Sequence, residues 1–216
     1  MTNKKHYKNF KTITIYPFIK MERIPLIIFD QKTIYSDQNN TQISLQTIIE
    51  TTDSQTPLYI KDHHALQGGE PSFQYIQRLS KQRQLWLDAA PQNTEDVFDY
   101  ILAGASVIII RQNHWKKPFF YDALQEIKQH IENPLYLERS WEKLPHEIPD
   151  ADGYIFLPGL PSQPNTIPPR YTFSSLSSTK PLYLYEPDPM KNTSSYSDSK
   201  NIGSIIDLAN YTKVNE

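Results

Sequence analysis

Three short apolar runs alternate with two helical patterns between residues 57 and 111. The runs cover 57–60, 84–87 and 106–110, and a charged residue follows each one: Asp62, Asp88 and Arg111. Apolar residues recur at helical spacing in the two segments between the runs, 71–81 and 94–103. Because parallel neighbouring strands need a crossover, and a helix is the usual one, this order predicts a parallel β-sheet.

The rest of the chain extends the same order in both directions. Five further apolar runs predict strands at 11–19, 134–137, 153–157, 181–185 and 202–208. Apolar spacing predicts three further helices at 42–50, 118–131 and 141–148. Residues 25–29 predict a hairpin-like extension of the first strand, and residues 33–37 predict a polar turn.

Eight strands with intervening helices predict an α/β fold, in which ligands bind at the carboxyl ends of the strands. A family resemblance carried by four sequence motifs favours the (β/α)8 TIM barrel among such folds. The chain is shorter than the roughly 250 residues of a typical barrel. The late crossovers are unlike helices. Segment 158–169 is rich in proline, which breaks helices, and almost nothing follows the last predicted strand. We therefore expect a shortened barrel with eroded late helices. An open doubly wound sheet is the alternative.

Composition narrows the class of protein. The 216 residues predict a single domain, with a flexible N-terminus at 1–10 and a flexible, serine-rich loop at 191–201. A net charge of −2 gives no basic surface for nucleic acid, and no apolar run is long enough for a membrane helix. Without cysteine there is no disulfide and no thiolate metal site. The N-terminus lacks the apolar segment of a signal peptide, so we expect a cytoplasmic protein with no metal and no cofactor.

Four motifs follow one another in the order and spacing of a known enzyme family. They read TIYSD, LYIKDHHALQGG, LWLDAAPQNTEDV and AGASVIIIR, at 33–37, 58–69, 85–97 and 103–111. They resemble the histidine-biosynthesis isomerases, the barrels that include the phosphoribosylformimino-aminoimidazole-carboxamide ribotide isomerase and the imidazole glycerol phosphate synthase cyclase. The resemblance is closest to the divergent branch of isomerase-related proteins in methanogens and methylotrophs, and it covers about half of the chain.

The resemblance implies a reaction in which two carboxylates face each other across the barrel mouth, on the first and fifth strands. Lys20, in PFIKM, stands at the first-strand position, and Glu138 stands at the fifth. An ammonium group cannot replace a carboxylate in this proton transfer, because its charge and its resting protonation state are both reversed. The resemblance therefore predicts that the family reaction is absent from this chain.

The family also holds two phosphate groups on glycine-rich loops, through backbone N–H donors. The chain has only 6 glycines but 17 prolines. Pro91 removes a donor after the third strand, and the loop after the seventh strand reads Glu186-Pro187-Asp188-Pro189, whose carboxylates repel phosphate. We therefore expect the sugar-phosphate site of the C-terminal half to be lost.

The candidate site residues are polar groups at the predicted strand ends. Asp62 and His64 share a face if the strand continues through them. Structural alternatives are a strand-end hydrogen bond for Asp62, a helix cap for Asp88, and an ion pair of Arg111 with Asp88 or Glu138, which we favour. The candidate catalytic residues are Asp62, His64, Asp88 and Glu138, and the candidate ligand-binding residues are Lys20, Arg111, Gln67, Gly68 and Gly69.

Two functions follow from these observations. The favoured one is a non-catalytic or accessory subunit in a one-carbon cofactor pathway of the tetrahydromethanopterin or methanofuran type, the context that the resemblance implies. The alternative is an active isomerase- or lyase-type enzyme of that biosynthesis, with Asp62, Asp88 and Glu138 as acid–base groups. We expect a protein partner or a second copy of the chain, and a small-molecule ligand, but neither nucleic acid nor a membrane.

Overall fold

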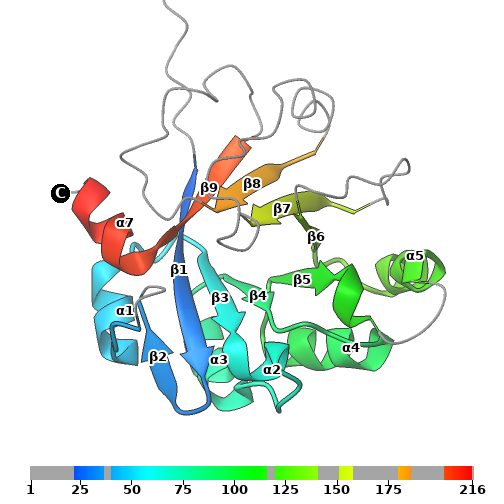
Figure 1. Ribbon diagram of the computed structural model, residues 1–216, viewed down its shortest axis with the longest axis horizontal. Coiled ribbons are helices and arrows are strands. Elements are labelled where there is room, and N and C mark those ends of the chain that lie inside the picture. Colours follow the sequence, from blue (N-terminus) through cyan, green and yellow to red (C-terminus); the bar gives the residue numbers. More distant parts are fainter. Residues whose placement is uncertain are drawn as a thin grey trace, which may run out of the picture.

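The strands of this protein close into a ring. The computed structural model describes residues 22–36, 40–115, 120–140, 151–157, 180–185 and 202–215. Neighbouring strands pair in parallel around the ring, and β9 closes it by pairing with β1 (Figure 1). The eight strands are β1 (Arg23–Asp30), β3 (Leu58–Asp62), β4 (Leu85–Asp88), β5 (Val107–Arg111), β6 (Leu135–Ser140), β7 (Gly153–Leu157), β8 (Leu182–Tyr185) and β9 (Ile202–Asp207). The predicted (β/α)8 barrel is confirmed, and the open sheet is excluded.

The larger helices lie on the outside of the ring (Figure 1). They are α1 (Leu45–Thr51), α3 (Phe73–Ser80), α4 (Thr94–Leu102) and α5 (Phe120–His130), which confirms the helices predicted at 42–50, 71–81, 94–103 and 118–131. Local signals fix their ends: the side chains of Ser44 and Asn93 accept backbone N–H bonds at the starts of α1 and α4. Gly104, at φ +104°, follows α4 in the left-handed conformation that ends many helices.

Two apolar layers result from the alternation of side chains along the strands. The outer layer packs strand residues such as Ile60, Leu87 and Ile110 against the helices. The inner layer fills the lumen, and four of its side chains are aromatic: Tyr59, Trp86, Tyr136 and Tyr183. Trp86 meets the rings of Tyr136 and Tyr183 edge-on, at centroid distances of 5.0 and 4.6 Å. The barrel interior is therefore a packed core.

The start of the barrel differs from the prediction. The apolar run at 25–29 is the first barrel strand itself, β1, because it pairs with both β3 and β9. The predicted hairpin extension is therefore wrong. Residues 33–35 form β2 (Thr33–Tyr35), which pairs antiparallel with β1, so the predicted polar turn is also wrong. The strand predicted at 11–19 lies outside the described residues.

Two further differences concern helices. A short helix, α2 (His63–Leu66), begins directly after β3, and α7 (Leu208–Asn215) follows the last strand, where almost nothing was expected. A 3-10 turn, η1 (Gln112–His114), follows β5. The helix predicted at 141–148, the flexible segments predicted at 1–10 and 191–201, and the eroded crossover at 158–169 lie outside the described residues.

We expect Gly203→Ala to lower the free energy of unfolding by about 1–3 kcal/mol, because it overpacks the lumen. A Cβ at Gly203 would lie 2.4 Å from the Tyr183 ring and 3.1 Å from the backbone oxygen of Glu22. Urea unfolding measures the change. Ser204→Ala is the matched control on the next residue, because the buried Ser204 Oγ has no hydrogen-bond partner among the described residues. Equal stability of the two variants would contradict the prediction.

Candidate functional site

A cluster of charged side chains forms where the strands end. On five strands, the residue two positions after a lumen residue is charged: Lys61 after Tyr59, Asp88 after Trp86, Arg111 after Ile109, Glu138 after Tyr136, and Asp207 after Ile205. Because side chains alternate between the two faces, these five belong to the inner face, directly above the aromatic lumen. We call Lys61, Asp88, Arg111, Glu138 and Asp207 the mouth cluster. In a barrel of this kind the carboxyl ends of the strands are where ligands bind.

Asp88 is the most enclosed member of the mouth cluster. Its side chain is fully buried, and both of its oxygens accept hydrogen bonds from Arg111: Nε donates to Oδ1 at 2.7 Å and Nη2 donates to Oδ2 at 2.5 Å. The Tyr59 hydroxyl also donates to Oδ2, at 2.9 Å. Burial alone would raise the pKa of Asp88, but the charge and hydrogen bonds of Arg111 outweigh it, and the pKa lies below its ordinary value. Asp88 is therefore held as an anion at neutral pH, with most of its acceptor positions engaged.

Arg111 joins two carboxylates. Besides its bidentate contact with Asp88, its Nη1 lies 3.4 Å from Oε2 of Glu138. Burial alone would lower the pKa of Arg111, but the charges of the two carboxylates outweigh burial, and the pKa lies above its ordinary value. The ion pairs favoured for Arg111 from the sequence are thus present. The same contacts occupy Asp88 and Glu138, the two mouth residues considered as acid–base groups.

Lys61 differs from the rest of the mouth cluster. It is half-buried, and its ammonium group makes no hydrogen bond or ion pair with any residue that the structure describes. Burial lowers the pKa of Lys61 from its ordinary value, and the nearby charge of Asp88 opposes this effect. Lys61 therefore holds its proton less tightly than an exposed lysine does.

Other polar groups surround the mouth cluster. The hydroxyl of Tyr185, at the end of β8, donates to Oδ1 of Asp207 at 2.9 Å. His63 and His114 stand just beyond the ends of β3 and β5. The pKa of His63 is lowered mainly by burial and further by the positive charge of Lys61. The pKa of His114 is lowered mainly by burial and further by the positive charge of Arg111. Both imidazoles are therefore mainly neutral at pH 7.

Asp62 and His64 lie apart from the mouth cluster. Asp62 is fully buried on the outer face of β3; its Oδ1 accepts from the N–H of Ala65 at 3.1 Å and its Oδ2 from that of Ser72 at 2.7 Å. These are the contacts of a helix cap for α2 and its following loop. His64 belongs to α2, so the expectation that it continues the strand and shares a face with Asp62 is wrong.

The predicted ligand-binding residues 67–69 end α2. Gln67 is the C-cap of this helix, and Gly68, at φ +88°, takes the left-handed conformation that glycine favours. Gly69 lies so close to the ring of His64 that a Cβ there would be 2.3 Å from Nε2. In the structure these glycines serve the tight turn and its packing. Their predicted role in ligand binding stays a prediction.

Lys20 lies outside the described residues, so its predicted role stays a prediction. The first strand that the structure describes is β1, and its residues 25–29 read PLIIF. Ile28 is buried on the inner-face side of β1 and pairs in register with Lys61. The inner face of β1 therefore presents an apolar side chain, Ile28, at the level of Lys61.

The predicted phosphate loops fall partly within the described residues. After β4, Ala90 has φ +48°, a left-handed conformation that suits glycine, and Pro91 follows it without an N–H. After β9, the carboxylate of Asp207 occupies the mouth. The loop at 186–189 lies outside the described residues. Where the structure describes these loops, their chemistry disfavours a phosphate group.

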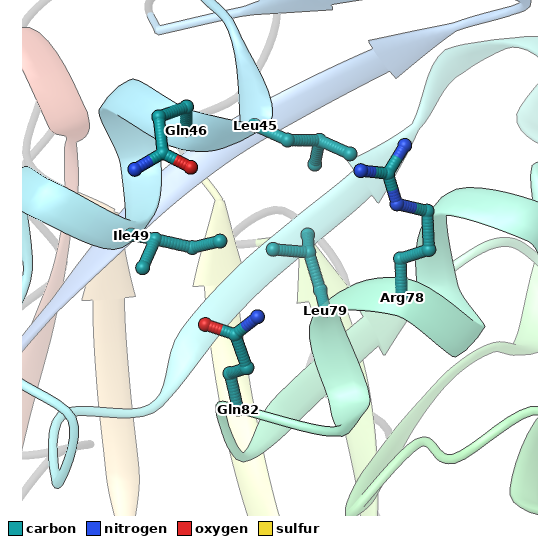
Figure 2. A pocket seen from close by; sticks show the side chains of 6 residues that line it. All are labelled: Leu45, Gln46, Ile49, Arg78, Leu79 and Gln82. Carbon is teal, nitrogen blue, oxygen red and sulfur yellow. The ribbon is translucent and has the colours of Figure 1, made fainter.

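A pocket of about 140 Å³ lies away from the mouth, between α1 and α3 (Figure 2). Drug-sized ligands occupy pockets of about 300–1,000 Å³, so this one is too small for a substrate of that size. None of the predicted site residues lines it; its lining consists of Leu45, Gln46, Ile49, Arg78, Leu79 and Gln82. Within the described parts of the chain, no group of three His, Asp or Glu side chains could hold a metal ion.

The sequence interpretation missed two members of the mouth cluster, Lys61 and Asp207, and the lumen residue Tyr59, which contacts Asp88. The signal was present in LYIKD, where a period of two places Tyr59 and Lys61 on one face and Ile60 and Asp62 on the other. The predicted site residue in this motif, Asp62, belongs to the outer face. The same period of two applies to residues 86–88, 109–111, 136–138 and 205–207. It places the other four charged mouth residues, Asp88, Arg111, Glu138 and Asp207, on the inner face.

Comparisons with known proteins do not show a family for this chain. No family model and no curated protein matches this chain. Among solved structures, it is similar to the orotidine 5'-monophosphate decarboxylase from Methanocaldococcus jannaschii, with a TM-score of 0.47 and 10% sequence identity over 90% of this chain and 98% of that one. No helix among the described residues is long and apolar enough to cross a membrane. The likeness to the histidine-biosynthesis isomerases stays a prediction from the motifs, and the chain is a TIM barrel by its own strand pairing.

Proposed function

We propose that this chain is a barrel protein of the histidine-biosynthesis isomerase design that has lost the ribotide isomerase reaction and acts as an accessory subunit with a ligand-binding mouth. The observation that carries this proposal is the state of the mouth carboxylates. Asp88 accepts hydrogen bonds from Arg111 and Tyr59, and Glu138 is paired with the same Arg111. Three hydrogen bonds engage most of the acceptor positions of Asp88 and lower its pKa, which makes this carboxylate a weak base.

The first strand supports the same conclusion. The two-carboxylate reaction needs a second acid–base group on the first strand, opposite the fifth, and the inner face of β1 offers Ile28 at the mouth. The mouth cluster also carries two cationic and three anionic groups, which is unfavourable for a substrate with two phosphates. The motif resemblance directs the search for a partner to enzymes of tetrahydromethanopterin and methanofuran biosynthesis.

Two measurements test the proposal. We expect the purified protein to leave the ribotide substrate of the isomerase unchanged, and we expect the tagged protein to co-purify from its native host with a stoichiometric partner, identified by mass spectrometry. A tag-only strain is the control for the purification. Turnover of the ribotide, or a monomer or homo-oligomer without a partner under the same conditions, would overturn the accessory role.

One observation favours a second candidate function, an active enzyme of the same pathway. Lys61 is an interior amine with no ion-pair partner among the described residues and with a pKa lowered by burial. Such an amine suits nucleophilic or acid–base work. Consumption of a pathway intermediate by the purified protein, abolished by Lys61→Arg, would favour this candidate over the accessory role.

A further inference from the structure

Lys61 is held in place at the base of the mouth. It lies on β3 two residues after Tyr59, whose ring is buried in the lumen, and its neighbours in register are Ile28 on β1 and Asp88 on β4. A half-buried lysine inside a barrel usually pairs with a carboxylate, because an isolated charge is costly to bury. Here the adjacent carboxylate, Asp88, is committed to Arg111 and Tyr59. The amine of Lys61 is therefore positioned for a group from outside the chain.

The charges around Lys61 define the class of that group. The mouth cluster sums to one negative charge when its two cations and three anions are counted. An anionic ligand would approach Lys61 past Asp88, Glu138 and Asp207, which repel it. A neutral ligand avoids this cost. A neutral electrophile also suits an amine that holds its proton weakly, as burial makes Lys61 do.

We propose that Lys61 binds the carbonyl group of an uncharged aldehyde or ketone as an imine at the barrel mouth. This inference rests on the ligand-binding mouth of the proposed function and names its ligand class. The neutral amine adds to the carbonyl carbon and forms the carbon–nitrogen bond. The carbonyl oxygen then leaves as water with the two protons of the amine, so no oxidant or reductant takes part. Neutral His63, beside Lys61, is suited to carry a proton between the amine and the departing oxygen.

Reductive trapping tests the proposal on the full-length protein. The folded protein is incubated with glycolaldehyde and cyanoborohydride near neutral pH, and the labelled lysines are mapped by peptide mass spectrometry. We expect Lys61 to be labelled several-fold faster than Lys32 and Lys81, which are exposed, because a lower pKa leaves more free amine. The preference should disappear in urea, where all lysines share one environment. Labelling of Lys61 no faster than that of Lys81 in the folded protein overturns the proposal.

Two further experiments test the charge of the ligand and the pH dependence of the labelling. Glyoxylate, an anionic aldehyde, should label Lys61 more slowly relative to Lys81 than glycolaldehyde does; a faster reaction overturns the uncharged ligand class. As the pH is lowered, labelling of Lys61 should persist after that of Lys81 has ceased. The charged groups that act on Lys61 are Asp88, Arg111, Glu138 and Asp207, and His63 is the neighbouring imidazole.

A matched variant distinguishes loss of the reactive amine from loss of folding. Lys61→Arg keeps the positive charge but removes the nucleophilic amine, so total incorporation of glycolaldehyde should fall to the level set by the exposed lysines. If the incorporation is unchanged while the variant remains folded by circular dichroism, Lys61 is not the reactive residue and the inference is overturned. Ribotide turnover and partner capture do not depend on labelling, so failure of the accessory role is recognised separately.

Discussion

Replacing Arg111 with methionine should lower the free energy of unfolding by about 3–5 kcal/mol, the cost of leaving a buried carboxylate without its charged partner. Asp88 is fully buried, and after the change only the Tyr59 hydroxyl would remain to donate to it. Methionine fills most of the space of the lost side chain, so the loss reports the charge and its hydrogen bonds more than a cavity. Urea denaturation of the two proteins at neutral pH measures the difference.

The pH dependence of this loss identifies its cause. Without Arg111, burial raises the pKa of Asp88, so protonation of the carboxyl relieves the penalty as the pH falls. We expect the stability gap between Arg111→Met and the native protein to narrow between about pH 7 and about pH 4. The double variant Asp88→Asn/Arg111→Met should recover part of the loss at neutral pH.

Arg78→Met is the matched control for the chemical change itself. Arg78 is exposed on α3, away from the mouth, and surface substitutions of this kind usually change stability by less than about 0.5 kcal/mol. A loss of less than 1 kcal/mol at Arg111, or a gap that does not narrow with falling pH, would contradict the assignment of Asp88 as a buried anion that depends on Arg111.

The alternation of apolar runs and helical patterns was enough to predict a parallel α/β sheet, because β3, β4, β5 and β6 each contain a continuous apolar run of the kind that parallel sheets bury on both faces. The choice of a barrel over an open sheet came from the motif resemblance, and the pairing of β9 with β1 confirms that choice. The first strand was misplaced for a physical reason. Residues 11–19 and 25–29 are both β-branched and apolar, and propensity alone does not say which of them pairs with β9. Only the long-range pairing decides which run is the first barrel strand. The same pairing places Ile28 of β1 at the mouth.

The candidate site was predicted in part. Arg111, Asp88 and Glu138 were selected and do lie together, because each belongs to the inner face of a neighbouring strand, near its carboxyl end. Asp62 and His64 were selected on the assumption that β3 continues, but the Asp62 side chain accepts the N–H of Ala65 as the N-cap of α2, and the strand ends there. Capping of this kind is a local signal, and a carboxylate directly before His-His-Ala-Leu could have predicted a helix start.

Trp86→Ala should be the most destabilising change in the lumen, with a loss of about 3–5 kcal/mol in the free energy of unfolding. The Trp86 indole is only 6% exposed and packs edge-on against Tyr136 and Tyr183, so its removal leaves a cavity at the centre of the inner layer. Tyr136 comes from β6, two strands along the ring from β4, and Tyr183 comes from β8, on the opposite side of the barrel, so Trp86 links across the lumen to β8. Urea unfolding followed by circular dichroism measures the loss without relying on the deleted fluorophore.

Controls for Trp86→Ala distinguish lumen packing from hydrophobic content. Leu102→Ala removes a side chain that is 82% exposed at the end of α4, and we expect it to change stability by less than about 0.5 kcal/mol. Trp86→Phe keeps an aromatic ring in the inner layer and should lose less than the alanine variant. An apolar cavity in a barrel core binds small aromatic molecules, so added indole should restore part of the stability of Trp86→Ala but not that of Arg111→Met. A loss at Trp86 no larger than that at Leu102 would mean that the lumen aromatics do not hold the two sides of the barrel together, and that space for a ligand extends below the mouth.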